Sequence, residues 1–106
     1  MLVTSFISVV LMANILIDQL HTLMNAQDFE RAYAVALSQS ENHQGDAAFD
    51  FYFGWAALET GHPDQAVIAL ERTLMINPDQ PRARLELARA YSQLHQWDLA
   101  EEQLAL

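Results

Sequence analysis

Lysine and cysteine are both absent from this chain of 106 residues, and glycine and proline occur only three times each. Without cysteine there can be no disulfide, no cysteine-ligated metal and no thiol chemistry. So few turn-forming residues argue against an all-β protein. The five basic residues are all arginine and face 14 acidic ones, which gives a formal net charge of -9. Such a chain lacks the clustered cations that a nucleic-acid backbone requires, so we expect no nucleic-acid partner.

The first 17 residues carry no charge, and the segment before Asp18 is apolar apart from Thr4, Ser5, Ser8 and Asn14. As a helix it would be about 25 Å long, at the short limit for a membrane span. Three interpretations stay open: the core of an export signal, a short membrane anchor, or a buried first helix. A signal normally begins with Lys or Arg and ends at a small-x-small site, and both are missing here.

Hydrophobic residues make up 52% of the sequence, enough for a folded core. An offset of 34 residues aligns Ala32 with Ala66 and Ala100, and places an acid two residues before each alanine. The segment before Ala66 contains Gly61 and Pro63, which mark a helix end and the next helix start. A self-match at this period predicts helix–turn–helix repeats.

The spacing resembles the tetratricopeptide repeat, whose sequence pattern is W-x2-L-G-x2-Y, then A-x3-F, then P. A set of residues in this chain occupies the corresponding positions and is expected to pack in the same way. These are Phe53, Gly54, Ala66, Leu70 and Pro78 in the second unit, and Leu87, Ala88, Tyr91, Ala100 and Leu104 in the third. Small residues let two helices cross closely, and the larger ones fill the layer beside that contact.

The resemblance implies an all-α fold of antiparallel helix–turn–helix units stacked as a short right-handed solenoid. We divide the chain into an apolar N-terminal segment (1–12), a degenerate repeat (13–46), a full repeat (47–80) and a truncated repeat (81–106). Helices are expected at about 3–26, with a possible break near Ala13, and at 29–40, 47–60, 63–76, 81–94 and 97–106. The polar stretch 40–46 is predicted to be a loop.

No catalytic, metal or cofactor motif stands out, so we expect a non-enzymatic protein without a cofactor. The four histidines lack the spacing of a metal site and are interpreted as solvated turn residues. Fourteen acids offer no distinguishable catalytic pair. Serine has no nucleophile-elbow context, and no glycine-rich phosphate loop is present.

Five aromatic residues between Phe49 and Trp55 are the strongest local feature, and they cannot all share one helix face. If Phe53 points into the core, Phe51 and Trp55 turn towards the concave side of the solenoid, which the family uses for binding. We therefore predict a groove for a protein or peptide partner, lined by Phe51, Trp55, Leu58, Arg82, Leu85 and Arg89. The alternatives are that the first repeat covers the aromatics, and that the arginines pair with Glu86 and other acids.

The run from Phe49 to Tyr91, above all Phe49–Gly54, Ala66–Arg72 and Arg82–Tyr91, is similar to the periplasmic repeats of surface lipoprotein assembly modifiers. This resemblance implies a place in the bacterial cell envelope, next to an outer-membrane barrel; a cytoplasmic location is the alternative. Leu104 and Leu106 lack a covering helix, so we expect the chain to continue or this end to be buried by another chain, a homo-oligomer being one such case. Membrane contact would then come only from the N-terminal segment or a missing C-terminal region.

Overall fold

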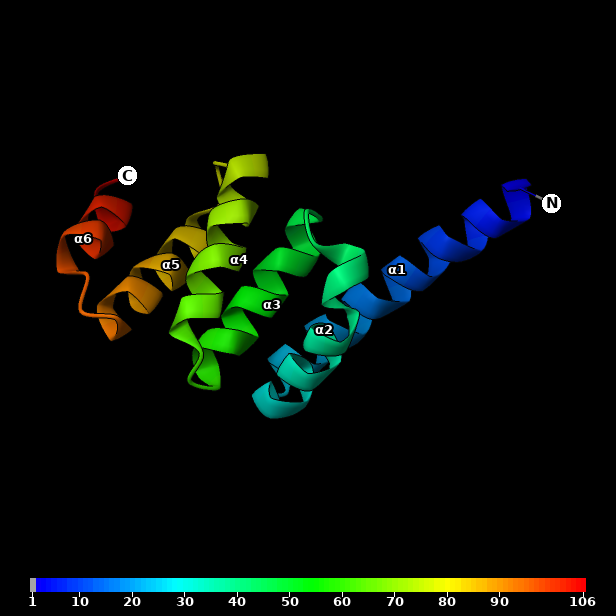
Figure 1. The fold of residues 1–106 in the computed structure, drawn as a ribbon, viewed down its shortest axis with the longest axis horizontal. Helices are drawn as coiled ribbons and strands as arrows, with labels where there is room; N and C mark the ends of the chain where they lie inside the picture. Colours follow the sequence, from blue (N-terminus) through cyan, green and yellow to red (C-terminus); the bar gives the residue numbers. More distant parts are fainter. Residues whose placement is uncertain (1) are drawn as a thin grey trace.

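The computed structural model describes residues 2–106, with side chains from Phe6 onward, and contains six helices and no strand in that part of the chain. They are α1 (Leu2–Asn25), α2 (Phe29–His43), α3 (Ala47–Glu59), α4 (Pro63–Ile76), α5 (Pro81–Gln93) and α6 (Trp97–Ala105). Short turns join them, and they stack in chain order along a body of 52 × 26 × 21 Å (Figure 1). The expected all-α helical repeat solenoid is confirmed.

Local chemistry explains where three of the helices begin. Pro63 and Pro81 occupy the first turns of α4 and α5, where a missing backbone N–H costs nothing. Asp46 caps α3 by accepting a hydrogen bond from the Phe49 amide at 3.1 Å.

Three turns within the helix pairs share one geometry at the 34-residue spacing. Gln27, Gly61 and His95 all have a positive φ, of 59°, 83° and 59°. In each turn the next residue's amide bonds to a carbonyl five residues earlier, at 2.8–2.9 Å. The backbone therefore repeats three times, although only one of these turn residues is glycine.

Two sequence-based predictions about the helices were wrong. The stretch from Ser40 to His43 belongs to α2 rather than to a loop, and the Ser40 hydroxyl donates to the Leu37 carbonyl within that last turn. The predicted break near Ala13 is also absent, because α1 runs unbroken through this residue. The division of the chain into units at 12/13, 46/47 and 80/81 stays a prediction.

The core runs between successive helices along the whole stack, both within the helix pairs and between them. Most of the residues that the repeat pattern singled out are buried: Phe53, Gly54, Ala66, Leu70, Leu87, Ala88, Tyr91 and Ala100. Pro78 is exposed in the turn between α4 and α5. Leu104 does not pack as predicted, because 65% of it is exposed.

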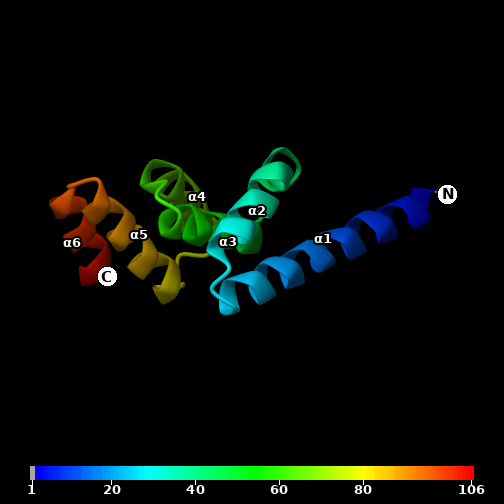
Figure 2. The same cartoon turned by 90° about the horizontal axis from the view of Figure 1, so that it is seen from below.

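The first helix differs from the others because only its C-terminal half enters the core. Leu16, Leu20 and Met24 are buried against α2 and α3. The N-terminal half extends away from the other helices, as two perpendicular views show (Figures 1 and 2).

Candidate partner-binding face

The aromatic residues of α3 divide between the core and the surface. Phe49 and Phe53 are buried and stack with their ring centroids 6.1 Å apart. Phe51 and Trp55 are half-buried on another side of the helix, with centroids 5.8 Å apart. The i, i+4 spacing thus places two aromatic rings together at the edge of the core.

The first repeat covers part of this aromatic surface, as one of our alternatives anticipated. Phe29 of α2 lies 6.3 Å from Trp55, measured between ring centroids. His21 of α1 is hydrogen-bonded to the Tyr52 hydroxyl at 2.7 Å. Burial and the nearby charge of Asp18 raise the pKa of Tyr52 above its ordinary value.

Leu58 does not belong to the predicted groove. Its side chain is only 2% exposed and lies in a core cluster with Ala83 and Leu87 of α5. The crossing of α5 over the end of α3 removes Leu58 from solvent, and helix spacing within α3 alone could not reveal this.

The remaining predicted residues come together on one surface, which we call the α3–α5 face: Phe51, Trp55, Arg82, Leu85 and Arg89. The Arg82 guanidinium carbon lies 4.3 Å above the centre of the Trp55 ring, an arrangement typical of a cation–π contact. Leu85 and Arg89 are exposed beside it on α5. The face therefore combines aromatic, aliphatic and cationic groups.

Two carboxylates, those of Glu86 and Glu59, pair with the arginines of this face. Glu86 is 1% exposed and accepts hydrogen bonds from Arg82 Nε at 2.9 Å and Arg89 Nη1 at 2.5 Å. Glu59 of α3 adds an ion pair to the same Arg89 nitrogen at 2.9 Å. The alternative of pairing with Glu86 is thus confirmed, although Glu86 is buried rather than solvated.

The four charges on this face sum to zero, so it carries no net attraction for anions at long range. Partial burial works to lower the pKa of Arg89, but the hydrogen bonds and charges of Glu59 and Glu86 outweigh it and raise the pKa above its ordinary value. Arg82 contacts Glu86 through Nε, and half of its side chain is exposed. A partner carboxylate could bind there bidentately, or displace Glu59 from Arg89.

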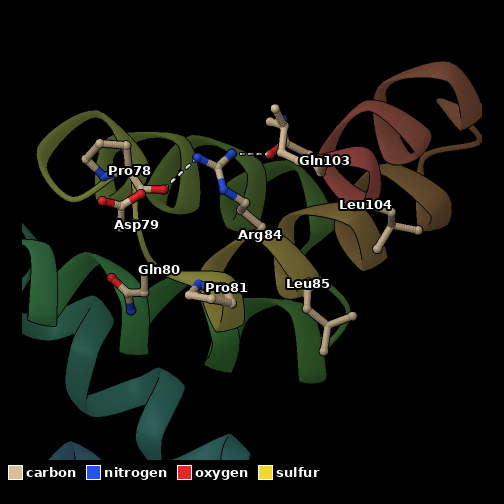
Figure 3. Close-up of a pocket in the computed structure, with 9 residues that line it drawn as sticks. Pro78, Asp79, Gln80, Pro81, Arg84, Leu85, Gln103 and Leu104 are labelled. Carbon is tan, nitrogen blue, oxygen red and sulfur yellow. Dashed lines mark hydrogen bonds between the residues drawn. The ribbon is translucent and has the colours of Figure 1, made fainter.

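A hollow of about 530 Å³ continues this surface towards the C-terminal end of the described chain. The turn Pro78–Pro81, Arg84, Leu85 and residues of α6 line it (Figure 3). Arg84 crosses the hollow by donating to the Pro78 carbonyl at 2.6 Å and to the Gln103 side chain at 3.3 Å. Leu85 lies at the junction of the face and the hollow.

Among the described residues, no three His, Asp or Glu side chains converge as metal ligands would. The predicted solvated turn histidines are not all solvated. His62 is half-buried, stacks on Tyr33 at 4.4 Å between centroids, and contacts the Thr60 hydroxyl at 3.1 Å.

The repeated turns and paired helices define a helical repeat solenoid. Residues 57–106, slightly less than half of the chain, match the family model of the tetratricopeptide repeat. Tetratricopeptide repeats are generally non-catalytic protein-interaction modules. A search of curated proteins gives no match to this chain.

Proposed function

We propose that this protein is a non-enzymatic interaction module that binds a segment of a partner protein across the α3–α5 face. The observation that carries the proposal is the stack of Arg82 on Trp55 beside exposed Leu85, on the first helices of two successive units. The general role of the family in protein interaction supports it.

Binding would bury an apolar stretch of the partner against Phe51, Trp55 and Leu85, with no covalent step. Most interface energy comes from such desolvated aromatic and arginine positions. The fixed Arg82 guanidinium would orient the segment through a carboxylate, with little side-chain entropy left to lose.

The test uses peptides selected from a random displayed library against the whole chain, with affinities measured by fluorescence anisotropy. We expect Leu85→Asp and Arg82→Gln each to weaken binding at least tenfold. Met75→Asp, at a more exposed apolar position on α4, serves as the control and should bind as the wild type does. Equal affinity for all four proteins would exclude the α3–α5 face as the binding site.

Trp55→Ala is a poorer test than the sequence suggested. Trp55 also packs against Phe29 and a core cluster, so its truncation removes structure as well as a binding surface. Trp55→Phe keeps an aromatic ring there and weakens the platform under Arg82.

We further propose that the module works in the bacterial cell envelope as part of a larger protein. The similarity of Phe49–Gly54 and Arg82–Tyr91 to surface lipoprotein assembly modifiers supports this location. Fractionation of the source cells with an antibody to this segment tests it. An envelope band well above 12.0 kDa is expected, whereas a 12.0 kDa cytosolic band would make the protein a free-standing adaptor.

A second candidate function is a spacer that oligomerises through its C-terminal end. Leu104 and Leu106, 65% and 81% exposed, favour it because they adjoin the 530 Å³ hollow. Sedimentation at increasing concentration would show a rising mass that Leu104→Gln/Leu106→Gln abolishes. A constant monomer mass would exclude this function.

A further inference from the structure

The N-terminal half of α1 is a long apolar surface that the other helices of the described chain leave largely exposed, although Val9, Met12 and Ile15 line a hollow of about 650 Å³ with α2. Between Phe6 and Ile15, the large hydrophobic residues are 44% to 71% exposed. Only 11% of the apolar segment Phe6–Asn25 is buried inside the molecule. The part of α1 before Leu16 is therefore exposed, unlike a core helix, which would be mostly buried.

The exposed side chains point in every direction around the helix axis. Successive residues of an α-helix are about 100° apart. Val9, Val10, Leu11 and Met12 therefore cover all sides within little more than one turn, and all four are exposed. A protein partner or a second copy would cover one stripe, whereas an all-round apolar helix is typical of a hydrocarbon environment.

The charge and the length of this part of α1 also fit a hydrocarbon environment. No charged residue precedes Asp18. The segment Phe6–Asn25, 20 residues with a mean hydropathy of 1.6, is long and apolar enough to cross a membrane. Leu16, Leu20 and Met24 lie in the core and Ile17 packs against it, so the free helix from Leu2 to Ile15 reaches about 21 Å. This exceeds one leaflet and falls short of a full hydrocarbon core of about 30 Å.

We propose that α1 inserts end-on into a lipid bilayer up to Ile15 and tethers the repeat solenoid directly at the membrane surface. Asp18 and Gln19, both exposed, mark the boundary with water. No lysine or arginine lies near this boundary, and the chain carries a net charge of -9. Insertion therefore depends on the hydrocarbon and gains nothing from anionic headgroups.

Flotation of the full chain with phosphatidylcholine vesicles tests the insertion. The wild type should float, and Val9→Glu/Met12→Glu should reduce the floated fraction at least tenfold. Ile68→Glu/Met75→Glu changes two comparably exposed apolar residues of α4 and should float like the wild type. Adding phosphatidylserine should not increase the floated fraction. A wild-type chain that stays unbound, or that requires phosphatidylserine, would overturn the proposal.

A single-cysteine scan tests the end-on geometry, because the chain has no cysteine of its own. A polarity-sensitive fluorophore is attached at position 9, 10, 11 or 12 in turn, and at exposed Glu101 of α6 as the control. Vesicles should shift all four α1 signals to the blue and leave the control unchanged. A shift on one side of the helix only would overturn end-on insertion and indicate a helix lying in the interface.

The same antibody used on source cells can yield the native N-terminus by sequencing. A native chain that retains Phe6–Ile15 fits the tether, and a chain that begins after Ile15 would contradict it. This proposal uses no residue of the α3–α5 face. The vesicle experiments can therefore fail while peptide binding to that face succeeds, and the reverse.

Discussion

The first and second repeat units achieve close helix packing in opposite ways. In the second unit Gly54 of α3 meets Leu70 of α4, and a Cβ at Gly54 would lie 2.7 Å from Leu70 Cγ. Thirty-four residues earlier the sizes are reversed, with Leu20 on α1 and Ala36 on α2, both fully buried in one cluster. The repeat thus requires one small residue at the crossing, and either helix can supply it.

The same units also differ at their buried ends. Asp50 in the second unit is fully buried and accepts bonds from the Gly45 amide at 3.0 Å and Arg72 at 3.2 Å. The equivalent residue of the first unit is Leu16, which lies in an apolar cluster. A degenerate repeat therefore keeps its shape while its polar contacts are replaced by apolar packing.

The largest expected effect comes from exchanging the small and the large side chain where α3 crosses α4, at Gly54 and Leu70. Gly54→Leu and Leu70→Ala should each lower the free energy of unfolding by about 3 kcal/mol, through overpacking and through a cavity. The double variant copies the Leu20/Ala36 arrangement and should recover about 2 kcal/mol of the summed loss. Urea denaturation of the four proteins measures this coupling, and strictly additive losses would contradict the equivalence of the two crossings.

Removing the Asp50 carboxylate should cost about 2–3 kcal/mol of unfolding free energy, because the Gly45 amide and Arg72 lose their partner. The cost is moderated because the Arg72 side chain is 30% exposed. Asp50→Leu combined with Arg72→Met imitates the first unit and should restore part of the loss. Arg31→Ala, which breaks an exposed 3.9 Å pair with Asp28, is the control, with an expected change below about 0.5 kcal/mol.

Much of the fold was predictable because its signals are local. The 34-residue period, Pro63, Pro81 and Gly61 located the helices to within a few residues. The burial of Leu58 was not predictable, because it depends on how α5 crosses α3. Glu86 lies at helix spacing from both Arg82 and Arg89, so its pairing was visible in the sequence. Its burial beneath the arginines was not, since that requires the stacked units.

The turn residues allow a comparison of all three units. Gly61→Gln should destabilise the second unit by about 1 kcal/mol, because only glycine adopts a positive φ without steric cost. Gln27→Gly and His95→Gly should stabilise the protein by up to about 1 kcal/mol for the same reason. Thermal unfolding of the three variants compares these shifts, and a loss of stability on introducing either glycine would contradict the shared turn.

Tyr91 of the third unit occupies the position that Leu23 holds in the first unit and Ala57 holds in the second. It is the only ionisable residue of the three. Tyr91 donates a hydrogen bond to Glu71, and burial together with Glu71 raises its pKa well above the ordinary 10.0. Its contribution to stability is therefore complete below pH 10 and is lost as the pH rises further towards the folded-state pKa. Tyr91→Phe should cost about 1 kcal/mol at neutral pH. Urea denaturation at a series of pH values measures the difference in the free energy of unfolding between the wild type and Tyr91→Phe. This difference should shrink above pH 10, and a difference that grows would contradict this account.

Mapping the site of a bound peptide tests the interaction function most directly. A library-selected peptide carrying a benzophenone group would be photo-crosslinked to the full chain, and its attachment points read by mass spectrometry. We predict attachment to α3 and α5, around Trp55, Leu85 and Arg89. Attachment confined to Leu104 and Leu106, or to the outer side of α4, would show that the α3–α5 face is not where this protein binds its partner.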